Sequence, residues 1–288
     1  MSSPSRELRA LLTRGRVLQV PGVYDGLTAR IAAEAGFEAI SITGNALAAS
    51  VLGAPDIGLT TLTEVVTTAR NIAASVQVPV IADADTGYGS VVNVTRTIRE
   101  FERAGVAGIH IEDQATPKRC GLVNMPIPVV TETEFVAKLR AADWARQDAD
   151  FVIIARTDAM STLGLDEAVR RANAYLAAGA DAAMIVGPKT AAEIRAAVAG
   201  VRGPLAIVMD ERGEAGDLNA DELTEMGLAM AAYAGVARYT VVKAVQASLA
   251  HLRRDGHSRN YRELMAPFEE WNRVVGFDEY VEIERKFS

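Results

Sequence analysis

Carboxylates and a guanidinium come at the ends of three consecutive apolar runs of residues. Their types and spacing favour metal-assisted chemistry on an anion. Asp83 and Asp85 come at the end of one run, Glu112 ends the next, and Arg156 ends the one after. Three close carboxylates raise one another's pKa values unless a cation lies among them. Mg²⁺ typically takes one or two carboxylates together with waters and substrate oxygens. The sequence therefore predicts a Mg²⁺ site, with Mn²⁺ as the alternative metal.

Arg156 and the acids also have purely structural interpretations. An acid that follows a strand often caps the next helix, as we expect for Asp25 and Asp166. Arg156 either binds a substrate carboxylate or phosphate through its guanidinium, or forms a salt bridge with an acid at the end of a neighbouring run. His110 lies inside an apolar run and points the same way as Glu112, so it is a core residue or a minor catalytic one. The spacing of the histidines does not indicate a metal site, and no phosphate-binding loop is evident.

The chain has a single cysteine, Cys120, which follows Lys118 and Arg119 and precedes Gly121. Nearby cations favour the thiolate and make a thiol useful as an acid or base near neutral pH. The segment 113–130 is long for a connection in a compact domain, and such loops are often lids over active sites. The alternative is a solvated basic loop that carries an incidental thiol.

Eight short apolar runs alternate with amphipathic stretches and predict the elements that must position these residues. Continuously apolar runs are typical of parallel strands that are covered on both faces. Repeated βα units predict an α/β fold, a (β/α)₈ TIM barrel, with a doubly wound sheet as the alternative. We expect one domain over 1–288, with a C-terminal helical extension at 258–288 that packs on a neighbouring subunit or on its own barrel. The predicted strands are 18–23, 38–43, 78–83, 107–112, 151–156, 182–187, 205–210 and 228–233.

Composition restricts the class of protein. The formal net charge of -7 gives no electrostatic reason to expect a nucleic acid or an anionic membrane as partner. The apolar runs are too short for a helix that spans a membrane, which needs about 20 residues. One cysteine excludes an internal disulfide framework and fits a reducing compartment. We therefore expect a cytoplasmic protein that acts on a small molecule.

Six collinear motifs resemble those of the isocitrate lyase/phosphoenolpyruvate mutase superfamily, most closely its methylisocitrate-lyase-like branch. The motifs read "GFEAISITGNALAAS", "LGAPDIGLTTL", "DADTGYG", "GIHIEDQ", "PKRCG" and "FVIIARTDA", and the resemblance as a whole extends from about residue 7 to 255. The resemblance implies a Mg²⁺-dependent enzyme that acts on 2-oxo or 2-hydroxy acids through an enolate. It also implies a homo-oligomer, a tetramer with exchanged C-terminal helices.

The resemblance assigns a role to each matching position. Asp83 resembles the main metal-side carboxylate, while Asp85 and Glu112 act largely through metal-bound waters. Cys120 resembles the lid cysteine that exchanges a proton with the enolate, and Arg156 the arginine that binds a substrate carboxylate. The remaining matches are Asp56 near the reacting centre, Lys118 in the lid, and Thr43, Gly44, Asn45 and Gly121 among the substrate-binding residues.

Three positions depart from the family's lyases. Leu122 stands where these lyases carry a histidine, Val186 where they carry a glutamate, and Val208 nearest to an expected asparagine. These departures argue against a true isocitrate or methylisocitrate lyase, and the Cys-Gly pair argues against the mutase branch. The first hypothesis is a carbon–carbon lyase for a 2-hydroxy di- or tricarboxylate, such as an alkyl-substituted malate. The alternatives are an oxaloacetate decarboxylase and a non-catalytic paralogue that binds oxo acids.

Overall fold

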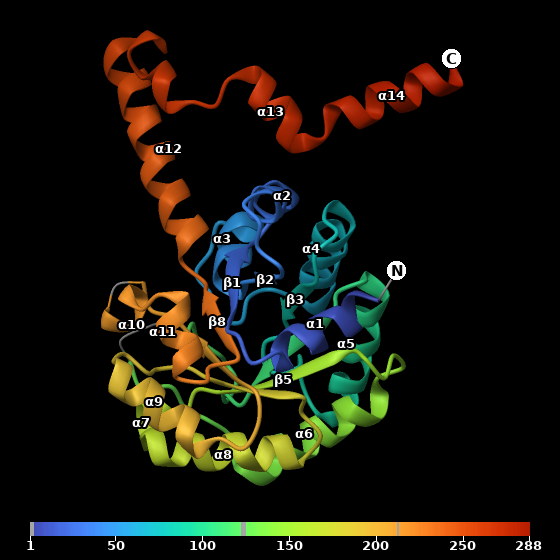
Figure 1. Cartoon of the computed structure of the whole chain (residues 1–288), viewed down its shortest axis with the longest axis vertical. Coiled ribbons are helices and arrows are strands. Elements are labelled where there is room, and N and C mark those ends of the chain that lie inside the picture. Colours follow the sequence, from blue (N-terminus) through green and yellow to red (C-terminus); the bar gives the residue numbers. More distant parts are fainter. Residues whose placement is uncertain (1–2, 122–124, 212) are drawn as a thin grey trace.

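Eight parallel strands close into a barrel in the order β1 to β8, which confirms the predicted TIM-barrel fold (Figure 1). The computed structural model describes residues 3–121, 125–211 and 213–288. β1 pairs with β8 as well as with β2, so the sheet has no free edge. The strands are β1 Leu18–Val23, β2 Ile40–Ile42, β3 Val80–Asp83, β4 Gly108–Glu112, β5 Val152–Thr157, β6 Ala182–Ile185, β7 Leu205–Val208 and β8 Met230–Tyr233.

Alternate residues of each strand enter two different apolar layers, as strand geometry requires. Ile81 of β3 and Ile154 of β5 belong to the layer inside the barrel. Ala82 and Ile153 belong to the layer between the strands and the surrounding helices. α1 (Pro4–Thr13) adds Leu8 to the inner layer. The barrel interior is therefore a packed core, and the polar chemistry lies at the carboxyl ends of the strands.

Helices follow the strands around the barrel. Asp25 caps α2 by accepting a hydrogen bond from the Thr28 backbone N–H, as expected. The prediction for Asp166 was wrong, because α8 begins at Leu165 and its N-cap is Gly164. The helices are α2 Gly26–Glu34, α3 Gly44–Leu52, α4 Leu62–Ser75, α5 Val91–Ala104, α6 Glu132–Ala145, α7 Met160–Leu163, α8 Leu165–Ala177, α9 Ala191–Gly200, α10 Glu214–Asp217 and α11 Ala220–Glu225.

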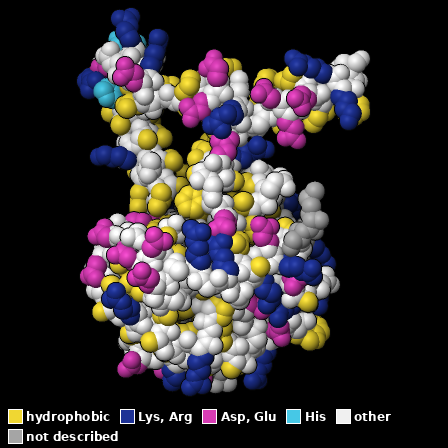
Figure 2. Space-filling model, in the orientation of Figure 1, with side chains coloured by type: hydrophobic (Ala, Val, Ile, Leu, Met, Phe, Trp, Pro, Cys, Tyr) yellow, Lys and Arg dark blue, Asp and Glu magenta, His cyan; other side chains and the backbone are white. Residues whose placement is uncertain are grey.

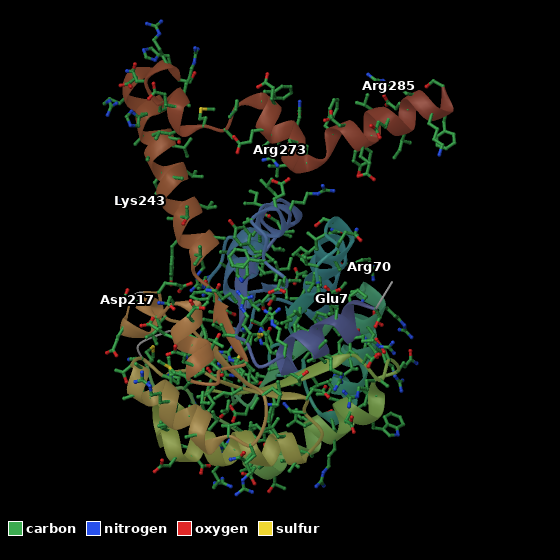
Figure 3. The ribbon with its side chains drawn as sticks, viewed as in Figure 1. Glu7, Arg70, Asp217, Lys243, Arg273 and Arg285 are labelled. Carbon is green, nitrogen blue, oxygen red and sulfur yellow. The ribbon has the colours of Figure 1, made fainter. Side chains whose placement is uncertain are left out.

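The C-terminal helices stand away from the barrel (Figure 1). α12 (Val236–Asp255) leaves the end of β8 and contains no buried residue. Beyond it lie the 3₁₀ helix η1 (Arg259–Leu264), α13 (Phe268–Val275) and α14 (Phe277–Phe287), and Arg273 and Arg285 mark the last two in Figure 3. Of these, α13 reaches back to α2, where Arg273 forms an ion pair with Glu34 at 2.7 Å.

Hydrophobic side chains line α12 on its exposed surface (Figure 2). Val242, Val245, Leu249 and Leu252 are all exposed and follow a spacing of three and four residues. Such a stripe lies on one face of a helix. In the part of the chain that the structure describes, no helix is both long and apolar enough to cross a membrane.

Candidate active site

Most of the predicted polar residues line one cavity at the carboxyl ends of the strands, while Asp85, Glu112 and Lys118 lie beside it, paired with those residues or with one another. The register places Asp83 beside His110 and Glu112 beside Arg156 on neighbouring strands. The cavity has a polar side, formed from the ends of β2 to β5, and an apolar side formed from β6 to β8. The polar side is lined by Thr43, Gly44, Asn45, Asp56, Asp83, His110, Cys120, Gly121 and Arg156.

Asp83 is held by two backbone N–H groups. Its Oδ2 accepts a hydrogen bond from Gly44 and its Oδ1 accepts one from Asp85, both at 3.0 Å. A Cβ at position 44 would lie 2.7 Å from Asp83 Oδ2, so only glycine allows this approach. The neighbouring Thr43 hydroxyl is buried and has no hydrogen-bond partner among the described residues. The backbone at 43–45 therefore presents polar groups to the cavity beside a fixed carboxylate.

Lys118 crosses from the cysteine-bearing segment to two carboxylates. Its Nζ lies 2.7 Å from Asp56 Oδ1 and 2.5 Å from Asp85 Oδ1. The side chain is buried, but the surrounding carboxylates outweigh the effect of burial and raise the pKa of Lys118 well above its usual range. Cys120 is tied to the same group, because its backbone N–H donates to the Asp56 carbonyl oxygen at 3.1 Å. The ammonium thus belongs to the carboxylate cluster.

Arg156 forms ion pairs with two acids. Its Nε and Nη2 donate to the two oxygens of Asp158, each at 2.9 Å, and its Nη1 lies 3.0 Å from Glu112 Oε2. Gly121 lies directly against this fork. A Cβ at position 121 would come within 2.5 Å of Asp158 Oδ1 and 2.6 Å of Arg156 Nη2. The segment that carries Cys120 is therefore in contact with the residue expected to bind a substrate carboxylate.

The buried acids differ in the direction of their pKa shifts. Burial opposes the charge on Asp83, but Coulombic attraction, including that of Lys118 and Arg156, outweighs it and lowers the pKa of Asp83. Burial, with repulsion from Asp83 and Asp56, raises the pKa of Asp85 to about 7 despite Lys118. Burial also raises the pKa of Glu112 well above its usual range. Burial lowers the pKa of His110, so its ring is neutral near pH 7.

The donor set fits a divalent cation that is bound partly through water. Among the described residues, two cations, Lys118 and Arg156, form the ion pairs of the acidic cluster. The cluster holds five acids, which leaves an excess of negative charge when all are ionised: Asp56, Asp83, Asp85, Glu112 and Asp158. Neither oxygen of Glu112 accepts a hydrogen bond in the described structure, and Oε2 has only its ion pair with Arg156. Within the same residues, no three histidine, cysteine or acidic side chains are placed to ligate one ion together. Mg²⁺, which often takes one or two carboxylates and keeps several waters, suits this arrangement.

Two further acids support the site and were missed at the sequence level. Asp158 holds Arg156, and the alternation of strand residues could have indicated it, because it lies two positions after Arg156. Asp113 is buried and accepts hydrogen bonds from the Thr157 hydroxyl, the Asp158 backbone N–H, Arg171 and the Tyr175 hydroxyl. Asp113 therefore fixes the end of β5, and its partners on α8 could not be paired with it from spacing alone.

Two of the three departures from the lyase pattern fall on the apolar side of the cavity. Val186 and Val208 both line it, together with Val20, Met184, Ala232 and Ala234. Leu122 lies outside the described residues. Arg238 from α12 also lines the cavity, and the sequence reasoning did not anticipate it.

The chain matches known proteins over almost its whole length. Residues 8–253 match the family described as phosphoenolpyruvate phosphomutase. The 2,3-dimethylmalate lyase of Eubacterium barkeri is 39% identical over 283 residues, which cover 98% of this chain and 97% of that protein.

Two solved structures have the same fold over nearly all of both chains. Oxaloacetate acetylhydrolase in complex with the inhibitor 3,3-difluorooxalacetate aligns with a TM-score of 0.92 at 34% identity, covering 99% of this chain and 97% of that one. Phosphonopyruvate hydrolase in complex with oxalate and Mg²⁺ aligns with a TM-score of 0.90 at 34% identity, covering 99% of each chain.

Proposed function

The chain belongs to the phosphoenolpyruvate mutase/isocitrate lyase superfamily, and from this premise we propose that it is a Mg²⁺-dependent carbon–carbon lyase. The proposed substrate is a 2-hydroxy di- or tricarboxylate of the substituted-malate type, which is cleaved to a 2-oxo acid and a carboxylic acid. One observation carries the proposal: Cys120 and Gly121 line the same cavity as Arg156, Asp56 and Asp83. This arrangement supports a role for the thiol as a proton donor beside the groups to which we assign binding of the 2-oxo acid.

Each proton and electron pair in this reaction has a destination. The 2-hydroxyl loses its proton, the C2–C3 bond breaks, and its electron pair remains on the departing half as an enolate. We assign the hydroxyl proton to Asp56, whose carboxylate lies in the cavity beside Lys118. The Cys120 thiol returns a proton to the enolate carbon. The backbone at Gly44 and Asn45, with Arg156, binds the carboxylate of the 2-oxo acid.

Preorganised charge supports the bond cleavage. Lys118 and Arg156 are buried and already fixed by carboxylates, so they need no rearrangement when negative charge develops. Asp83 would hold Mg²⁺, with Asp85 and Glu112 acting through its waters. When bound, the metal would polarise the oxygen on C2 as a Lewis acid. The structure of phosphonopyruvate hydrolase with oxalate and Mg²⁺ supports this choice of metal.

The apolar side of the cavity narrows the choice of substrate. Val186 and Val208 stand where the family's lyases for tricarboxylates carry polar side chains. Buried aliphatic groups leave a third carboxylate without a partner, whereas they favour alkyl substituents on C2 or C3. We therefore favour an alkyl-substituted malate, in line with the similarity to 2,3-dimethylmalate lyase.

Product analysis tests the proposal. The protein is incubated with Mg²⁺ and with alkyl-substituted malates, methylisocitrate or oxaloacetate, and the products are followed by NMR. A lyase yields an oxo acid and a carboxylic acid from a substituted malate, and EDTA abolishes the reaction. Pyruvate and CO₂ from oxaloacetate would instead establish the decarboxylase, and binding without any product would establish the non-catalytic paralogue.

Cys120→Ser separates the first two outcomes. A lyase that uses the thiol as its proton donor should lose most of its activity, by about 10²–10⁴-fold for a general acid. A decarboxylase should keep much of its rate, because protonation of its enolate need not involve Cys120. Gly26→Ala is a suitable control, since an added Cβ there meets only Ser75 at ordinary contact distance.

We further propose that the protein is a homo-oligomer, a tetramer, in which the exposed faces of α12 to α14 pack on a second copy. The stripe of Val242, Val245, Leu249 and Leu252 is exposed along a helix that has no buried residue. A contiguous apolar face of this kind favours a partner of matching surface. Light scattering should give four copies for the full chain. Replacing Val245 and Leu249 by glutamate should yield smaller species, and an unchanged mass would contradict the proposal.

A further inference from the structure

Arg238 is a cation in the cavity to which the proposed reaction assigns no role. It lies in the first turn of α12 and lines the same cavity as Arg156. Its Nε is buried without a hydrogen-bond partner, and no carboxylate in residues 3–121, 125–211 or 213–288 forms an ion pair with it. Arg156, by contrast, is engaged by Asp158 and Glu112 through all three guanidinium nitrogens. Arg238 therefore has donors to spare for a ligand.

The guanidinium of Arg238 is held in place by its neighbour. It lies 4.7 Å from the centre of the Tyr239 ring, and its Nη2 donates to the Tyr239 hydroxyl at 3.0 Å. Gly235 permits this packing, because a Cβ there would come within 2.5 Å of the Tyr239 ring. Stacking on an aromatic face orients a guanidinium without neutralising its charge. The cation is thus fixed before a ligand arrives.

The end of α12 is not itself the anion site. Glu211 Oε1 accepts hydrogen bonds from the backbone N–H groups of Gly235 at 2.6 Å and Val236 at 3.0 Å. This carboxylate satisfies the first donors of the helix and offsets its positive end. It also fixes the turn that carries Arg238. Glu211 is a positioning residue, and the side chain of Arg238 is the group that faces the cavity.

The cavity that Arg238 lines has an apolar side. Met184, Val186, Val208, Ala232 and Ala234 line the side of the cavity formed by β6 to β8. A buried N–H without a partner in such surroundings is unfavourable, and a carboxylate removes that penalty through a charge-assisted hydrogen bond. Two guanidinium groups thus line the cavity, Arg156 at the acidic cluster and Arg238 beyond the aliphatic side chains.

We propose that Arg238 binds the second carboxylate of the substrate, the one remote from Arg156, and so selects dicarboxylates over monocarboxylates. This inference rests on the proposed lyase function and specifies its substrate class: two carboxylates separated by carbons that can carry alkyl groups. Cleavage of the C2–C3 bond leaves the enolate on the half that bears this second carboxylate. Arg238 therefore also faces the charge that develops on the departing half.

A binding experiment tests the inference without relying on turnover. Dissociation constants for malate and for malate 4-amide are measured by calorimetry with Mg²⁺, in the full-length protein and in Arg238→Gln. The amide keeps the hydroxyl and the first carboxylate but removes the second charge. We expect wild type to prefer malate by about 10- to 100-fold, as for hydrogen bonds to a charged group. Arg238→Gln should reduce this ratio to within about threefold of one, and Arg238→Lys should restore part of it.

Two controls make the result decisive. Arg70→Gln, on α4 and exposed, makes the same chemical change away from the cavity and should keep the wild-type ratio (Figure 3). Oxalate binding reports the proposed oxo-acid site independently of Arg238, and it should be equal in wild type and Arg238→Gln. A malate-to-amide ratio that Arg238→Gln leaves unchanged, with oxalate still bound, overturns the role of Arg238 alone. Loss of oxalate binding in wild type overturns the proposed function and this inference with it.

Discussion

A methyl group added at Gly121 should disable the site while the barrel stays intact. The Cβ of Gly121→Ala would come within 2.5 Å of Asp158 Oδ1, 2.6 Å of Arg156 Nη2 and 3.0 Å of Val186 Cγ1. Real Cβ contacts do not approach so closely, so either the Cys120 segment or the Arg156–Asp158 pair must shift. Both shifts damage the same arrangement, because the first moves the thiol and the second opens the guanidinium fork.

The size of the effect follows from the bond that must yield. Arg156 Nη2 donates to Asp158 Oδ1 at 2.9 Å, and a hydrogen bond to a charged group contributes about 1.5–3 kcal/mol. Loss of that amount from transition-state stabilisation lowers kcat/KM by about 10- to 150-fold. Global stability should change little, since Gly121 lies in a connecting segment and not in the core.

Steady-state kinetics on the substrate identified by NMR measure kcat/KM, and urea unfolding measures the free energy of unfolding. Gly26→Ala is the matched control, because the nearest atom to its Cβ would be Ser75 Oγ at 3.6 Å. If Gly121→Ala keeps kcat/KM within about threefold of wild type, the close contact between Gly121 and the Arg156–Asp158 pair is not needed for catalysis. Unfolding of Gly121→Ala at the temperature of the assay would contradict the claim that the damage is local.

Two further predictions concern buried acids. Burial raises the pKa of Asp85 to about 7, so the folded protein favours its protonated form. In EDTA the free energy of unfolding should therefore fall as pH rises from about 4 to about 7 and level off above that, and urea titrations should show a flatter profile for Asp85→Asn. Asp113→Asn weakens the anchor of Arg171 and Tyr175 and should lower stability by about 3–5 kcal/mol. Tyr175→Phe should cost only about 1 kcal/mol in the same assay, and equal losses would refute the ranking.

The sequence predicted the barrel because burial on both faces of parallel strands leaves a local record. Runs such as 151–156 are continuously apolar, and the structure places β5 within one residue of that prediction. The end of a strand then locates the polar residue that follows, which is how Asp83, Glu112 and Arg156 could be expected at one rim. These inferences need only the period of the strand and the direction of the chain.

Other features depend on contacts that no local pattern records. Lys118 reaches Asp85, 33 positions earlier, because a connecting segment folds back over the rim. An amphipathic stretch reads the same whether its helix covers its own barrel or leaves it, so the course of α12 could not be predicted. Arg238 lines the cavity only because α12 begins at the rim and then turns away.

The pairing of Lys118 with Asp56 and Asp85 means that the protein carries its own counter-ion. Without such a counter-ion, the carboxylates of the cluster would repel one another whenever Mg²⁺ is scarce. Here a tethered ammonium neutralises part of that charge at all times, and it cannot diffuse away. Removal of the proposed Mg²⁺ should accordingly abolish the proposed lyase activity while leaving the protein folded, so that activity returns when Mg²⁺ is restored. In Lys118→Met, removal of the proposed Mg²⁺ should also destabilise the carboxyl ends of the strands. The proposed Mg²⁺ would then be seen to act both in catalysis and in stability.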